Sequence, residues 1–125
     1  MSLEEAQILR ERAKAFLKNA ESLFKEGVYD LAAFNVEQYC QLMLKYKLLV
    51  KTGTYPRTHS IIRLVRELSK IDEKAGQLLR DMIMVTKIED AYIGSRYLPR
   101  RYEKEEVEAM LKYAKEVFEV VTNEL

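Results

Sequence analysis

Apolar residues recur at intervals of three or four along most of the chain, the spacing that places them on one face of an α-helix. Signals typical of β-strands are absent from the sequence. The pattern predicts four long helices and one short helix, over residues 3–26, 29–51, about 60–70, about 73–91 and 103–123.

Glycine and proline are scarce, so the breaks between these helices are easy to place. Gly27 is expected to end the first helix, and the short gap after it forces an antiparallel hairpin. Pro56 prevents the second helix from continuing, while Gly94 and Pro99 bracket an irregular loop over residues 93–102. The candidate N-caps of the third and fourth helices are Thr58 or Ser60, and Asp72.

The predicted fold is all-α: an antiparallel up-down bundle of four long helices plus one short helix, in a single domain over residues 1–125. The helix over residues 29–51 is apolar on more than one face and is expected to be the most buried. Two further helices are expected to bury apolar faces, formed by Ala75, Leu78, Leu79, Met82 and Ile83 and by Val107, Met110, Leu111, Ala114, Val117, Phe118 and Val121.

The numbers of cysteine, histidine and glycine residues exclude several kinds of functional site. The chain has 125 residues with one cysteine, Cys40, and one histidine, His59, which excludes an intramolecular disulfide, a zinc cluster and a di-iron bundle site. Its four glycines stand apart and form no phosphate-binding loop. We expect no metal and no cofactor. No stretch resembles a signal peptide or is long enough to cross a bilayer, so a cytoplasmic location without membrane attachment is expected.

The formal charge of +1 conceals a segregation of charge along the chain. Residues 38–66 hold six Lys or Arg and no acidic residue, whereas the segments on either side are mildly acidic. Cations at a helix C-terminus are favoured by the helix dipole, which accounts for the lysines of this window but less well for Arg57 and His59. A second basic cluster comprises Arg96, Arg100, Arg101 and Lys104.

Tyrosines accompany the basic residues around both irregular loops. If the fourth helix runs back toward the end of the bundle where the third begins, the two loops meet there. Arginine forks suit phosphate oxygens, and tyrosine rings offer a face for a base. Alternatively, the tyrosines only cover one end of the bundle, with arginines lying over them. The residues concerned are Tyr46, Lys47, Lys51, Tyr55, Arg57 and His59 at the first loop and Tyr92, Arg96, Tyr97, Arg100, Arg101 and Tyr102 at the second.

Three segments of the chain resemble the HEPN family, named for nucleotide binding in higher eukaryotes and prokaryotes. They are residues 33–45 of the second helix, the turn and helix start at residues 57–61, and the loop at residues 91–97. The chain looks most like small prokaryotic members and the branch similar to the sacsin C-terminal domain. This resemblance implies a compact bundle, a homodimer and a minimal nucleotidyltransferase partner, in a two-gene system of the toxin–antitoxin kind.

Ribonuclease members of the family carry an Arg and, after four to six intervening residues, a His, near the start of the last helix. Arg96 matches the Arg, but residues 101–103 are Arg, Tyr and Glu, so the imidazole that would move the proton is missing. The resemblance also implies inward polar groups at Glu37 and Gln38. It further implies ligand contacts at Lys45, His59, Arg96 and Tyr97, and the basic loop residues Arg57 and Arg101 complete the candidate ligand-binding set.

Three functions stay open on the sequence. The leading hypothesis is a homodimeric module that binds a nucleotide or phosphate, with a nucleotidyltransferase partner. The second is a metal-independent ribonuclease in which His59, with Arg96 or Arg101, replaces the missing histidine. The third is a structural dimerisation module without a ligand. The expected ligands are nucleotide or RNA, no motif points to DNA, and whether the chain is an enzyme is left open.

Overall fold

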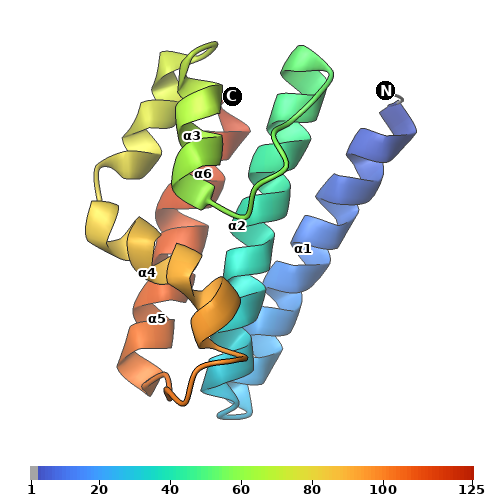
Figure 1. Ribbon diagram of the computed structural model, residues 1–125. Helices are drawn as coiled ribbons and strands as arrows, with labels where there is room; N and C mark the ends of the chain where they lie inside the picture. The colour runs from blue at the N-terminus through green and yellow to red at the C-terminus, as the bar shows by residue number, and fades with distance from the viewer. Residues whose placement is uncertain (1–2) are drawn as a thin grey trace.

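The computed structural model describes residues 3–125 and contains only helices and connecting segments over that range (Figure 1). This confirms the predicted all-α bundle. The last three elements follow one another without a break, and η2 is a π-helical turn between two α-helical parts. The elements are α1 (Leu3–Lys25), α2 (Tyr29–Thr52), α3 (Ile61–Ser69), the 3₁₀-helix η1 (Glu73–Leu79), α4 (Met82–Gly94), α5 (Lys104–Tyr113), η2 (Ala114–Phe118) and α6 (Glu119–Asn123).

Helices α1 and α2 form the predicted antiparallel hairpin. Gly27 has a φ of +79°, which favours glycine, and the backbone N–H of Val28 donates to Leu23 O at 2.9 Å. Helix α1 buries three alanines spaced two turns apart, Ala6, Ala13 and Ala20. Their small side chains let α1 and α2 approach closely. Helix α2 lies at the centre, in contact with α1 and with α3 to α6, and is the most buried helix, as predicted.

The chain turns back on itself after α2. Gly53 has a φ of +86° and its N–H donates to Leu49 O, which ends the helix. The following segment then returns along α2 to the level of Gln41, about three helical turns below the end of the helix (Figure 1). Helix α3 starts there, with Ser60 as its N-cap. His59 therefore lies beside the middle of α2 rather than at its end.

The prediction of one continuous helix over residues 73–91 is wrong, because the chain forms two elements there, η1 and α4. Asp72 caps η1, as expected, but Asp81 accepts a hydrogen bond from Met84 N and starts α4 in a new direction. The change of direction leaves Met82 and Ile83 exposed, although both were expected in the core. Val117 is also exposed against expectation. It lies in the π-helical turn, whose extra residue breaks the 3.6-residue period.

The two irregular loops do not meet at one end of the bundle. Figure 1 shows the segment after α4 beside the turn between α1 and α2, opposite the end of α2. There the N–H of Tyr102 donates to Asp30 Oδ1 at 2.7 Å. The expectation failed because the returning segment makes α3 run parallel to α2, so that η1 and α4 bring the chain to the other end. No helix within residues 3–125 is long and apolar enough to span a bilayer.

Candidate anion-binding site

A buried carboxyl group lies in the middle of α2. Glu37 is shielded from solvent, and its two oxygens accept hydrogen bonds from the side-chain amides of Gln38 at 2.7 Å and Gln41 at 2.6 Å. Burial raises the pKa of Glu37 to about 7, against the opposing effects of these hydrogen bonds and of the positive charges on Arg96 and Lys45. Two cations from separate elements thus converge on one carboxyl group.

Gln41 connects Glu37 to the other polar groups. Its amide nitrogen donates to Glu37, so its oxygen faces the other way, where it accepts from Lys45 Nζ at 2.9 Å and lies 3.4 Å from His59 Nδ1. Because an amide oxygen only accepts, this arrangement places the His59 proton on Nδ1 and leaves Nε2 as an acceptor in the neutral ring. Burial lowers the pKa of Lys45, an effect that Glu37 opposes.

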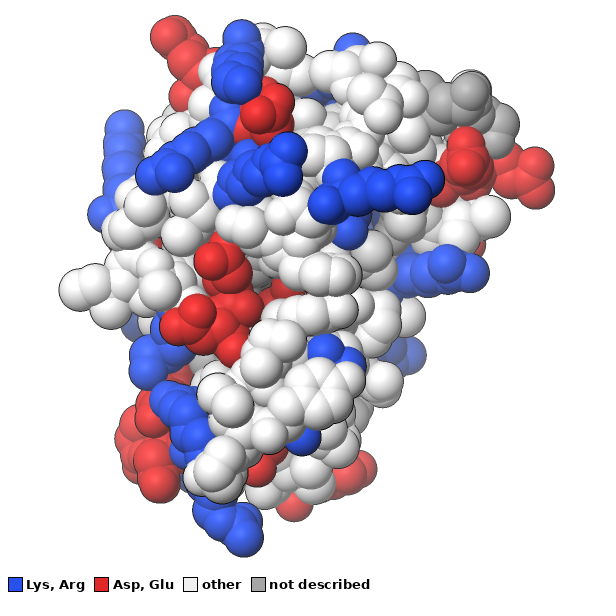
Figure 2. Space-filling view, in the orientation of Figure 1, with Lys and Arg blue, Asp and Glu red and all other residues white. Residues whose placement is uncertain are grey.

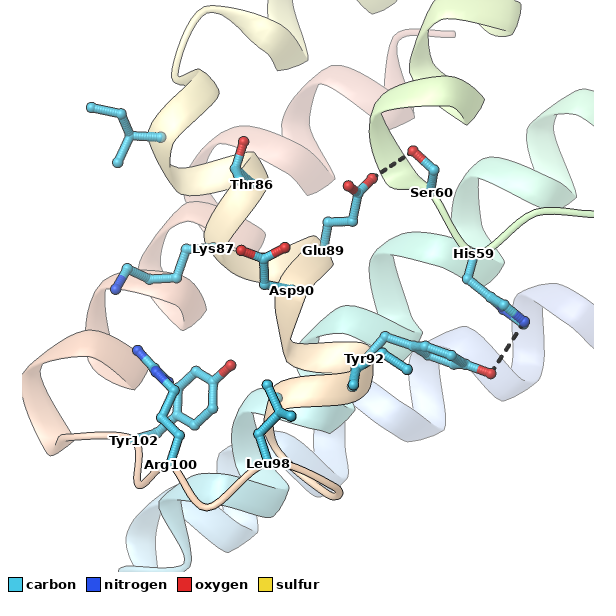
Figure 3. A pocket seen from close by; sticks show the side chains of 13 residues that line it. His59, Ser60, Thr86, Lys87, Glu89, Asp90, Tyr92, Leu98, Arg100 and Tyr102 are labelled. Atoms are coloured by element: carbon cyan, nitrogen blue, oxygen red, sulfur yellow. Dashed lines mark hydrogen bonds between the residues drawn. The ribbon is translucent and has the colours of Figure 1, made fainter.

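His59 is held on its other side by α4. Its ring stacks on Tyr92, with centroids 4.2 Å apart and planes inclined by 17°. The Tyr92 hydroxyl lies 3.2 Å from His59 Nε2, the contact drawn as a dashed line in Figure 3, and donates to it in this tautomer. The stack therefore joins the returning segment to α4 and orients the only imidazole of the chain.

Arg96 lies just beyond the C-terminus of α4. Its Nε and Nη2 donate to Tyr92 O at 3.1 and 2.7 Å, an arrangement that the negative end of the helix dipole favours. The guanidinium also lies over three aromatic rings, 4.3 Å from the centroid of Phe34, 4.8 Å from Tyr92 and 4.6 Å from Tyr97. Arg96 itself remains exposed, so its outer edge is accessible to an oxyanion.

A cleft of about 600 Å³ adjoins this network, and His59 and Tyr92 form one of its walls (Figure 3). Two cations, Lys87 and Arg100, line another part of it. Both are already bound to Glu106, at 3.2 and 2.7 Å, whereas Lys45 and Arg96 form no ion pair within residues 3–125. The cations best placed to receive a new anion are therefore those beside Glu37, rather than those of the cleft.

The structure brings together part of the predicted site. Lys45, His59 and Arg96 surround the Glu37 and Gln41 network, and Tyr97 packs against Arg96. The other two candidates lie apart. Arg57 is exposed on the returning segment, and Arg101 lies in a separate pocket beside Asp30.

Three residues of the site escaped the sequence reasoning as members of it. Gln41, Phe34 and Glu89 were not among the predicted site residues. Glu89 Oε1 accepts from Ser60 Oγ at 2.6 Å and from Ile62 N at 3.0 Å, and so ties α4 to the start of α3 (Figure 3). A usable signal existed for Gln41, since it lies one helical turn from both Glu37 and Lys45.

Figure 2 shows how charge is distributed on this face of the molecule. Basic side chains gather over its upper part and acidic side chains near its middle. The acid-free window supplies Arg57, Arg63 and Arg66, none of which forms an ion pair within the described range of 3–125. In the same range no group of three or more His, Cys, Asp or Glu side chains is arranged to hold a metal ion.

A comparison with the models of known families identifies the family of the chain. The model of the HEPN domain matches residues 6–125, nearly the whole chain. No curated protein matches the sequence. The matched region includes α2, the returning segment, α4 and Arg96, that is, every element that contributes to the network around Glu37. The chain belongs to the HEPN domain family.

Proposed function

We propose that this protein is a nucleotide- or phosphate-binding HEPN module that acts as a homodimer. The observation that supports the proposal is the convergence of Lys45, His59 and Arg96 on the buried network around Glu37, with the ring of Tyr97 alongside. Lys45 and Arg96 would bind phosphate oxygens, and His59 would donate a hydrogen bond. Tyr97, which is 67% exposed, offers a face for a base or sugar.

Isothermal titration calorimetry with ATP, GTP and a short RNA at low salt tests this proposal. We expect binding by the wild type, and a loss of about tenfold or more in affinity for Lys45→Ala and for Arg96→Ala, because each removes a charge-assisted contact. Lys112→Ala, at an exposed lysine on α5, is the matched control and should leave the affinity unchanged. Absence of binding by the wild type would overturn the proposal.

A metal-independent ribonuclease is the second candidate. It is favoured by one observation, namely that the contact with Gln41 leaves Nε2 of His59 as an acceptor, 3.2 Å from the Tyr92 hydroxyl at a wall of the cleft. Arg96 is the nearer of its two proposed cationic partners, since Arg101 lies in another pocket. This activity predicts RNA cleavage in the presence of EDTA that disappears in His59→Ala. Cleavage that survives the substitution would contradict the role of His59.

The remaining parts of the proposal concern partners. A minimal nucleotidyltransferase is proposed as the partner on the basis of family resemblance, and co-expression followed by sedimentation of the mixture tests it. A structural dimerisation module without a ligand is the outcome if the protein dimerises while all three titrations show no heat of binding.

A further inference from the structure

The outward face of α4 carries a stripe of five residues, of which four are exposed and the fifth, Lys87, is half-buried beside Glu106. Its members recur at intervals of three or four, which places them on one side of the helix: Ile83, Thr86, Lys87, Asp90 and Ile93. Ile83 is 82% exposed and Ile93 is 46% exposed, a large exposure for two isoleucines on one helix face. All five residues line the cleft of Figure 3.

This stripe is complementary to itself when the helix is reversed. An antiparallel copy of α4, related by a two-fold axis at the level of Ile88, sets Ile83 opposite Ile93 and Thr86 opposite Asp90. Lys87 lies next to the position that faces Asp90, within reach of its flexible side chain. One symmetry operation therefore pairs apolar residues at both ends of the stripe and opposite charges at its middle.

The two charged side chains of the stripe are also free to form ion pairs with a second copy. Asp90 is exposed and forms no hydrogen bond or ion pair within residues 3–125. Lys87 binds Glu106 at 3.2 Å, but Arg100 binds the same carboxylate at 2.7 Å. Lys87 can therefore turn to Asp90 of a second copy while Glu106 keeps a cationic partner.

We propose that α4 is the dimerisation helix of this protein, and that it packs antiparallel against α4 of a second copy through the stripe from Ile83 to Ile93. The occupant of the cleft is then the second copy rather than a small ligand. The inference rests on the homodimer in the proposed function and specifies its interface. Because His59 and Tyr92 form a wall of the same cleft, the second copy also closes one side of the candidate site.

Two charge variants test the pairing by sedimentation velocity across a range of protein concentrations. Thr86 and Asp90 are both exposed, so Thr86→Glu and Asp90→Arg should fold normally. Thr86→Glu sets an acid opposite Asp90, and Asp90→Arg brings a second cation beside Lys87. A two-fold axis repeats every contact, so each variant should weaken self-association by about tenfold or more. An equal mixture of the two variants restores opposite charges at one contact and leaves the other native, so it should associate nearly as well as the wild type.

Glu108→Arg, at an exposed acid on α5, is the matched control and should dimerise as the wild type does. Dimerisation unaffected by both α4 variants would overturn the interface and leave the dimer intact. Weakened variants whose mixture fails to associate would overturn the antiparallel pairing. A monomeric wild type in the high micromolar range would overturn the interface together with the dimer. Nucleotide titration of Lys45→Ala and Arg96→Ala tests the ligand proposal separately, because neither residue belongs to the stripe.

Discussion

Glu37 is the residue whose chemistry depends most on its surroundings. Its carboxyl group is buried, and burial raises its pKa from the ordinary 4.5 to about 7, even though two amides and two cations favour the charged form. The folded chain therefore keeps this proton at pH values where the unfolded chain has lost it. Between about pH 4.5 and pH 7 the folded state binds more protons than the unfolded state, so the contribution of Glu37 to stability falls as pH rises.

Glu37→Gln should remove this pH dependence. Above pH 7 the folded wild type must bury a charged carboxylate, and the shift of the Glu37 pKa from 4.5 to about 7 sets this cost at about 3 kcal/mol, which the neutral amide avoids. The new amide nitrogen cannot accept one of the two hydrogen bonds that reach Glu37, which costs about 1 kcal/mol. We expect a net gain of about 2 kcal/mol in the free energy of unfolding in mildly alkaline buffer and little gain in mildly acidic buffer. Urea denaturation followed by circular dichroism measures both, and an equal effect in the two buffers would contradict the assignment.

At the scale of elements, the position of His59 depends on how α3 begins. Ser60 Oγ accepts from Arg63 N at 3.1 Å and donates to Glu89 of α4, which also accepts from Ile62 N. A carboxylate from one helix thus completes the N-terminal cap of another, where the helix dipole favours negative charge. This contact fixes the end of the returning segment, and with it the distance from His59 to Gln41.

Glu89→Ala should loosen this junction. It removes two hydrogen bonds and the charge at the α3 N-terminus, so we expect a loss of about 2 kcal/mol in the free energy of unfolding. Glu108→Ala, at an exposed acid on α5, serves as the control and should change stability by less than about 0.5 kcal/mol. Chemical denaturation gives both values. A loss in Glu89→Ala no larger than in the control would show that the junction does not hold α3.

At the scale of the whole molecule, a formal charge of +1 coexists with a strongly uneven surface (Figure 2). Basic side chains gather over the upper part of the face in Figure 2. In the same orientation, Figure 1 shows α3 and the end of α2, which belong largely to the acid-free window of residues 38–66, in this upper part. Three arginines of that window, Arg57, Arg63 and Arg66, have no acidic partner within residues 3–125 and lie outside the Glu37 network. Charges so placed affect how fast an anion arrives more than how tightly it is held.

The triple variant Arg57→Ala, Arg63→Ala, Arg66→Ala should therefore slow the association of a fluorescent ATP analogue about threefold or more at low salt, with little change in its dissociation rate. Raising the salt to about 0.15 M should reduce the difference, since the Debye length then falls to about 8 Å. Stopped-flow fluorescence measures both rates. A large increase in the dissociation rate would instead place one of these arginines in contact with the ligand.

Local sequence was sufficient for the all-α class, the α1–α2 hairpin with Gly27, the burial of α2 and the helical run that starts near residue 103, because each follows from short-range periodicity and capping. It also placed Lys45, His59 and Arg96 among the candidate residues. Tertiary structure alone decided that Asp81 starts a new helix, that the segment after α2 turns back, and that His59 meets Gln41 and Tyr92. The direction of a chain after a helix ends is set by distant contacts such as the one between Glu89 and Ser60, and no local pattern records which distant residue supplies the partner.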